Sequence, residues 1–292
     1  MTCHKLALIV ATLLGSLAAA PGVFAQDSGA IVVEGDRQRE AEIVRDLAHD
    51  LTRPPPVDKP VPKFMEPVCL GAFGIEAGYG AALVDRIADN AREVGAPVGK
   101  PGCRPNVIVA FVEDGDRAIR ALKKARPGVF GDLTDYQIKQ AMNEDGPVRV
   151  WTPVETRDSF GRSMALSTDE EYTTNKLISG SHIAVPVQAA MTAAVVLISR
   201  RVVPGKTIRQ LADYATMRAL AATRPTGEGA GSGPRTILAL FDAGDAAADG
   251  LTGFDRAYLK ALYTSSRGER ASTLASAVAS RYFSERQNKA ER

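Results

Sequence analysis

The sequence VIVAFV, residues 107–112, is an unbroken apolar run rich in β-branched side chains, which is typical of a strand buried on both faces of a sheet. Upstream, residues 68–73 form a shorter apolar segment that predicts a second strand. Between the two, apolar side chains recur at helical spacing from Leu83 to Val94, and Gly95 follows where a glycine commonly ends a helix. The order strand, helix, strand predicts an α+β or α/β fold in which helices flank a mixed sheet.

The same periodicities continue toward the C-terminus. Short helices are expected over about 119–126 and 133–142, and a strand over 147–156. Residues 183–199 are the most apolar stretch after the N-terminal 25 residues, and two interpretations stay open: a membrane span, or two buried strands with a bend. A helix is expected from Thr207 to Pro225, followed by two terminal helices over 254–263 and 272–283.

The N-terminal part has a different organisation. An amphipathic helix is expected over 36–52, and residues 53–63 hold five prolines, which favour an extended linker. We therefore expect four parts: a signal peptide (1–25), an N-terminal helix with a Pro-rich linker (26–63), a main α+β domain (64–266), and a C-terminal helix and tail (267–292).

Residues 1–25 have the three parts of a cleavable signal peptide. His4 and Lys5 precede an apolar run over 6–20, and Val23-Phe24-Ala25 gives a small-residue cleavage pattern before Gln26. The pattern predicts a periplasmic or secreted protein with no stable membrane span after cleavage. An uncleaved N-terminal anchor is the alternative.

The charge balance and the cysteine content of the chain after cleavage bear on its partners and on its covalent structure. Of 36 Lys and Arg residues the signal holds only Lys5, so 35 basic residues face 34 acidic ones, and the balance gives no reason to expect nucleic acid as a partner. Cys69 and Cys103 remain after cleavage, and in an oxidising compartment such a pair predicts one disulfide. Two free thiols or two isolated zinc ligands are the alternatives.

No complete catalytic motif is present. After cleavage the only histidines are His49 and His182, so a zinc site with two histidines one helical turn apart is excluded. Ser181 adjoins His182, and adjacent strand residues point to opposite faces, so the two cannot act as nucleophile and base. No glycine-rich segment has the spacing of a phosphate-binding loop, and no cofactor is expected.

A family resemblance lies in three segments: QLADYATMRAL (210–220), TILALFD (236–242) and LTGFDRAYLKALY (251–263). Over about residues 65–265 the chain resembles a family of exported alphaproteobacterial proteins, which is distantly similar to a domain family with a zincin-like, metallopeptidase-type layout. In zincins the helix after the sheet edge carries His-Glu-x-x-His. Here the corresponding helix offers only Asp213 as a ligand, so the resemblance implies a scaffold without its metal site.

The polar face of that helix is the predicted functional surface, with Arg209, Asp213, Tyr214 and Arg218 as binding residues. An ordinary solvated helix face is the alternative. Three functions stay open: a non-catalytic envelope protein that binds a protein or peptide, an envelope hydrolase that uses carboxylates such as Asp213 and Asp255, and an inert structural or assembly factor. The sequence leaves undecided whether the protein is an enzyme.

Overall fold

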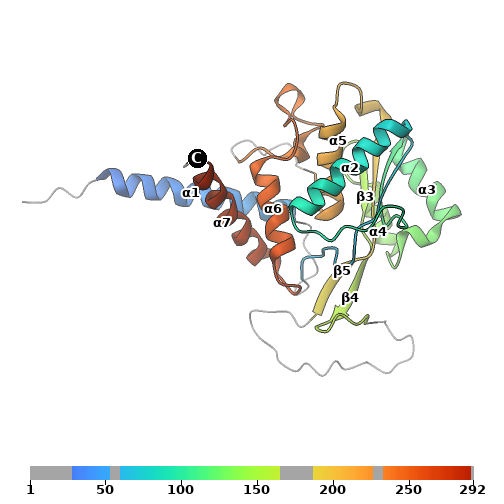
Figure 1. Ribbon diagram of the computed structural model, residues 1–292, viewed down its shortest axis with the longest axis horizontal. Coiled ribbons are helices and arrows are strands. Elements are labelled where there is room, and N and C mark those ends of the chain that lie inside the picture. The colour runs from blue at the N-terminus through green and yellow to red at the C-terminus, as the bar shows by residue number, and fades with distance from the viewer. Residues whose placement is uncertain (1–27, 53–59, 165–186, 226–232, 291–292) are drawn as a thin grey trace, which may run out of the picture. The chain divides into compact units, whose positions relative to one another are not determined.

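The computed structural model describes residues 28–52, 60–164, 187–225 and 233–290 (Figure 1). The chain divides into two compact units at Gln38, within helix α1 (Ser28–Leu51). The second unit, Arg39–Arg292, contains all the strands described below.

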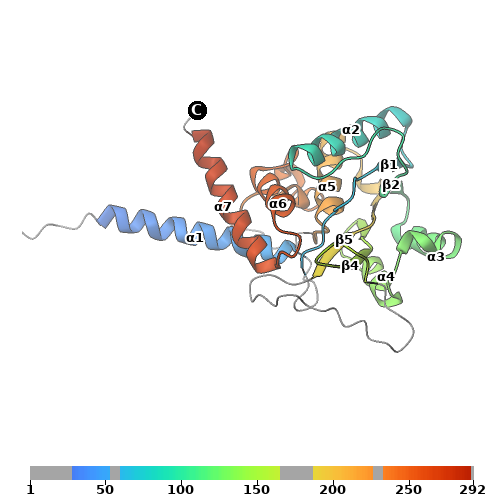
Figure 2. The same cartoon turned by 60° about the horizontal axis from the view of Figure 1, so that its bottom comes forward.

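A four-stranded mixed sheet lies at the centre of the second unit. The strand order is β1-β2-β6-β3, with bounds Leu70–Phe73, Val107–Val112, Ala194–Ser199 and Val148–Trp151. β1, β2 and β6 are parallel, and β3 pairs antiparallel with β6. The predicted α+β fold is confirmed, and the stretch 107–112 is a central strand of its sheet. Figure 2 shows this strand, β2, beside β1.

Helices cover both faces of this sheet, so alternate residues of β2 enter two different cores. Val109 and Phe111 lie in the larger core, and Ile108 and Ala110 contact the smaller one. The larger core includes residues of helices α2 (Ala77–Glu93), α5 (Ile208–Leu220), α6 (Gly253–Thr264) and α7 (Ala271–Ala290). The smaller core includes residues of α3 (Gly115–Ala125), the 3-10 turn η1 (Pro127–Phe130) and α4 (Asp135–Met142).

The strand expected over 147–156 is in fact two strands, β3 and β4 (Val154–Asp158). The segment that pairs with β3 and β4 is also interrupted, between β5 (Val187–Met191) and β6. Pairing moves by one residue across the break, since Trp151 faces Val195 whereas Val154 faces Met191. Pro153 lies at this break, where it removes a backbone donor, and β4 and β5 form a separate antiparallel sheet.

For residues 183–199 the interpretation as two strands with a bend is confirmed from Val187 onward, and 183–186 lie outside the described residues. None of the helices in the described part of the chain is long and apolar enough to cross a membrane. The helix α5 begins after Thr207 as expected but ends at Leu220, before Pro225. Gly95 adopts a φ of +83°, as a glycine that ends a helix requires.

The end of the Pro-rich segment is joined to the C-terminal helices. The Lys63 side chain is buried, and its Nζ donates to the carbonyl oxygens of Leu262 (2.9 Å) and Ser265 (2.8 Å) at the C-terminal end of α6. Burial lowers the pKa of Lys63 to about 8, although Glu269 raises it. The Val61 amide donates to the Glu269 carbonyl. The parts expected at 26–63 and 267–292 therefore contribute residues to the same compact unit as the central sheet.

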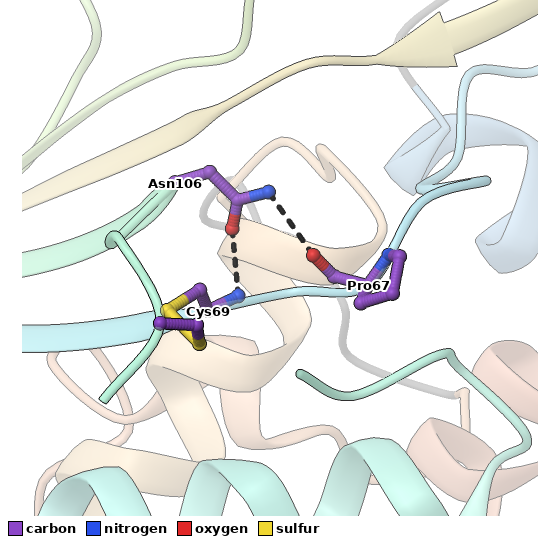
Figure 3. The surroundings of a disulfide bond; sticks show 4 residues. Pro67, Cys69 and Asn106 are labelled. Atoms are coloured by element: carbon purple, nitrogen blue, oxygen red, sulfur yellow. Dashed lines mark hydrogen bonds between the residues drawn. A yellow bond between two sulfur atoms is a disulfide. The ribbon is translucent and has the colours of Figure 1, made fainter. Parts of the chain in front are cut away.

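Cys69 and Cys103 form the predicted disulfide, with Cα atoms 5.9 Å apart. Asn106 supports it, because its Oδ1 accepts from the Cys69 amide (2.7 Å) and its Nδ2 donates to the Pro67 carbonyl (3.3 Å), as Figure 3 shows. The bond therefore joins the start of β1 to the chain that leads into β2.

Candidate functional site

Helix α5 carries all four predicted binding residues. It begins with a capping box in which Thr207 and Gln210 satisfy each other's backbone amides, so the helix starts at a defined residue. Of the four, only Arg209 is exposed. The expectation of one polar face open to water or to a cleft is wrong for Asp213, Tyr214 and Arg218, which are all buried. The side chains lie in two separate networks.

Asp213 faces helix α2. Its Oδ1 accepts from Arg86 Nε (2.7 Å) and Asn90 Nδ2 (2.6 Å), and its Oδ2 accepts from Arg86 Nη2 (2.9 Å) and the Leu251 amide (2.7 Å). Asn90 also donates to Thr216 on the next turn of α5. The Asp213 network thus joins α2, α5 and the loop before α6, and it uses both carboxylate oxygens.

Gly250 allows this loop to approach. A Cβ at residue 250 would lie 2.5 Å from Asp213 Oδ2 and 2.8 Å from Arg209 Nε, closer than real Cβ contacts come. Arg209 and Asp213 therefore both lie beside Gly250. Arg209 approaches the glycine from the exposed side of the helix. The close contact explains why a glycine precedes the Leu251 amide that binds Asp213.

The ionisation of Asp213 follows from these contacts. Burial alone would raise the pKa of its carboxyl, but hydrogen bonds from Arg86, Asn90 and the Leu251 amide outweigh burial and hold the pKa below the ordinary value of 3.8. Asp213 is therefore a carboxylate at neutral pH.

Replacing Asp213 by alanine is expected to lower the free energy of unfolding by about 2–3 kcal/mol at neutral pH, because Asn90 and the Leu251 amide lose their acceptor. Because its pKa is lower in the folded chain, the carboxylate's contribution is complete above the unfolded pKa and is lost as the pH falls through the folded pKa. The difference between wild type and variant should therefore shrink when urea unfolding is repeated at about pH 3. Asp249→Ala, at an exposed aspartate of the same loop, is the control and should change stability by less than about 0.5 kcal/mol. Equal losses for both variants would contradict the Asp213 network.

Tyr214 and Arg218 form the second network with a residue far away in sequence. Arg218 Nη1 donates to the Tyr214 hydroxyl (3.0 Å), and Nη2 donates to Glu144 Oε1 (2.6 Å) from the loop between α4 and β3. The Arg218 guanidinium also lies 5.8 Å from the centre of the Tyr214 ring. The network therefore ties α5 to the chain that leads into β3.

The contacts in this network determine the ionisation of Arg218 and Tyr214. Burial would lower the pKa of Arg218, but Tyr214 and Glu144 raise it above the ordinary value, so the guanidinium stays charged. Burial raises the pKa of the Tyr214 hydroxyl, which stays protonated at neutral pH. The Phe241 ring packs edge-on against Tyr214, with centroids 4.9 Å apart. These contacts give the pair an internal role in place of the surface role expected from the sequence.

Asp255, the other carboxylate considered for catalysis, is fully buried at the start of α6. Its Oδ1 accepts from the Thr236 hydroxyl (2.5 Å), and its Oδ2 accepts from the amides of Ile237 (2.9 Å) and Thr252 (2.8 Å). Burial raises the pKa of the Asp255 carboxyl, although these hydrogen bonds act to lower it. Asp255 therefore lies in the first turn of α6, where it also fixes the segment 236–237.

His49 is exposed on α1, and Ser181 and His182 lie outside the described residues. In the described ranges no three His, Cys, Asp or Glu side chains gather closely enough to hold a metal ion. Comparison with protein-family models, with curated proteins and with solved structures finds no match to the chain.

The residues that bind the α5 side chains were not predicted from the sequence. Arg86 and Asn90 lie on helix α2, and Glu144 lies in a short polar loop. A charged residue at the centre of an otherwise apolar helix was the available signal, because such a residue is rarely buried unless it is paired. No spacing in the sequence shows which residue is the partner.

Proposed function

We propose that this chain is an exported protein of the cell envelope that binds a protein or peptide and does not act as an enzyme. The bonding of the α5 side chains carries the proposal. Asp213 accepts hydrogen bonds from α2 and from the loop before α6 through both carboxylate oxygens, and Arg218 donates to Tyr214 and Glu144 through Nη1 and Nη2. A substrate would have to displace these internal partners. A zincin-like scaffold whose ligand-bearing helix has become part of the core is consistent with this function.

Two features support export. The N-terminal sequence has the pattern of a cleavable signal peptide. The pair Cys69 and Cys103 is disulfide-bonded, and such bonds persist mainly in oxidising compartments.

Exposed aromatic side chains support a binding role. Phe160 and Tyr136 are each 69% exposed. Phe160 is presented by a tight turn in which Asp158 Oδ1 accepts from the amides of Phe160 and Arg162, and the Arg162 guanidinium lies 5.4 Å from the Phe160 ring centre. A turn that presents an aromatic ring and a cation is suited to contact another protein, since aromatic and arginine side chains are enriched at interfaces.

Production of the full-length chain in a Gram-negative host tests export. We expect a mature N-terminus at Gln26, recovery from the periplasm or medium, and no thiol that reacts with a maleimide until the protein is reduced. A variant lacking residues 2–25 should remain in the cytoplasm with reactive thiols. An unprocessed chain in which Cys3, Cys69 and Cys103 are all free thiols would refute the export.

Photo-crosslinking in cells tests the binding role. A photoreactive amino acid at position 160 or 136 should crosslink to a discrete envelope protein, and the same group at Asp89, exposed on α2, should not. Identical patterns at all three positions would count against the binding role. Stoichiometric zinc in protein purified without chelator would refute the proposal that the zincin-like scaffold lacks its metal site.

The alternative, an envelope hydrolase, predicts that Asp213→Ala or Asp255→Ala abolishes a measured hydrolytic activity. We expect these variants to lose stability only, because both carboxylates are held by internal donors. Loss of activity in a variant whose unfolding is unchanged would support the alternative instead.

A further inference from the structure

Helix α3 carries a local excess of positive charge on a chain that is nearly neutral. Residues 117–126 hold five lysine and arginine side chains and no aspartate or glutamate. The helix packs on the smaller core through Ile119, with Ala118 and Leu122 beside it, and it lies next to α4 (Figure 1). The charged side chains therefore lie on the faces of α3 that the core leaves open.

Arg117, Arg120 and Lys124 form one stripe on the outer face of α3. Their spacing of three and four residues places them on one side of the helix, opposite the side chains that enter the core. All three are exposed, and none forms a salt bridge with another described residue. Lys123, by contrast, pairs with Asp135 of α4 at 2.7 Å. The stripe therefore consists of cations that the described chain leaves available to a partner.

Helix stability accounts for only part of the stripe. The helix dipole favours a cation in the last turn, so Lys124 stabilises α3 by itself. Arg117 lies in the first turn, where the same dipole disfavours a positive charge. Asp114 already satisfies this end of the helix, because its Oδ1 accepts from the Arg117 amide at 2.8 Å. Residues that break such a local rule are expected at functional sites, which favours a binding role for Arg117.

We propose that an acidic segment of another protein binds along this stripe, with its carboxylates on Arg117, Arg120 and Lys124. The inference rests on the proposed function, because it takes the partner to be a protein or peptide, and it adds the partner's charge and the contact surface. The stripe extends about 10 Å along α3, at 1.5 Å per residue. Side chains on one face of an extended peptide repeat every 7 Å or about that distance, so carboxylates at alternate positions reach the long side chains of the stripe.

The charges around the stripe favour a linear partner over an anionic membrane surface. The Arg117 amide, together with the charges of Arg117 and Arg120, lowers the pKa of Asp114, so this exposed carboxylate lies close to the stripe. Asp135, paired with Lys123, is a second exposed carboxylate on the α4 side. A continuous layer of lipid phosphates would meet these carboxylates as well as the cations, whereas one acidic segment along the stripe meets the cations alone. An alanine is the apolar residue exposed among the cations, and it is too small to anchor the helix in a bilayer.

Binding of a short labelled peptide of alternating glutamate and serine, followed by fluorescence anisotropy at low salt, tests the proposal. We expect saturable binding to the mature protein that weakens as added salt screens the charges, and no binding of a peptide with glutamine in place of glutamate. Arg117→Gln, Arg120→Gln and Lys124→Gln together should weaken binding by about tenfold or more. The triple variant should keep the melting temperature of the wild type, because these side chains form no salt bridge with the described residues.

A second triple variant, with Arg37→Gln, Arg39→Gln and Arg45→Gln, is the matched control, since it removes the same charge from exposed positions of helix α1. It should bind the peptide as the wild type does. Equal weakening in both triple variants, or no binding of the peptide to the wild type, would overturn the proposal. Tighter binding of phosphatidylglycerol vesicles or of single-stranded RNA than of the peptide, lost in the α3 variant, would also overturn it.

These outcomes are distinct from those of the crosslinking test at positions 160 and 136, which probes other side chains. Absence of peptide binding with both crosslinks intact would refute the α3 surface and leave the binding role in place. Peptide binding that depends on the stripe, without a crosslink at either position, would refute the aromatic contacts and support the α3 surface.

Discussion

Replacing Arg218 by methionine is expected to lower the free energy of unfolding by about 3–5 kcal/mol, because it leaves the Glu144 carboxylate buried without its cation. The Glu144 side chain is only 9% exposed, so water cannot readily replace the guanidinium. The loss should appear as a lower urea midpoint with an unchanged slope, followed through the fluorescence of Trp151, the single tryptophan.

Arg209→Met is the matched control, since it changes the same residue type on the same helix at an exposed position. It should alter stability by less than about 0.5 kcal/mol. Combining Arg218→Met with Glu144→Leu should recover part of the loss, because it removes both buried charges together. If Arg218→Met is no more destabilising than Arg209→Met, the ion pair contributes nothing to the fold.

The second large effect is expected from the disulfide. Replacing Cys69 and Cys103 together by alanine opens a closed loop of 34 residues, and the chain-entropy model gives a loss of about 3–4 kcal/mol. In a chain of this size the loss corresponds to a melting temperature lower by roughly 6 °C. The bond also orders the start of β1, so the loss should come with faster hydrogen exchange in β1 and in residues 97–99.

Reduction provides the control for this prediction. Dithiothreitol should lower the melting temperature of the wild type to that of the double variant, and it should leave the double variant unchanged. A double variant that melts with the wild type would show that Asn106 and the β1–β2 pairing hold this region without the covalent bond.

Local patterns in the sequence correctly predict those strands and helices that are determined by neighbouring residues alone. The apolar run at 107–112 and the capping sequence at Thr207 each determine their own structure, and each was predicted at the correct place. Pro153 also acts locally, but its effect on the strand expected over 147–156 was overlooked. A β-branched run reads as continuous unless the missing donor of a proline is taken into account.

The prediction of an exposed binding surface on α5 was wrong for a different reason. A polar residue on a helix has the same spacing whether it faces water or a buried partner, and the partner of Arg218 lies 74 residues away. Asp213 likewise depends on Asn90, 123 residues away, in a helix whose polar face also looks solvated. Pairing over such separations follows from how the layers assemble, which no local pattern in a single sequence records.

The contact between Lys63 and the end of α6 has a consequence for the order of events during synthesis. It joins residues 199 positions apart, and the Thr52 hydroxyl meets that of Tyr258 across 206 positions. Contacts of such high sequence separation form late, because a long loop must close before they contribute. The core therefore stays incomplete until the last helices have left the ribosome, and until then the nascent chain remains unfolded. A protein with this topology can pass a secretion channel before it folds, as the proposed export requires.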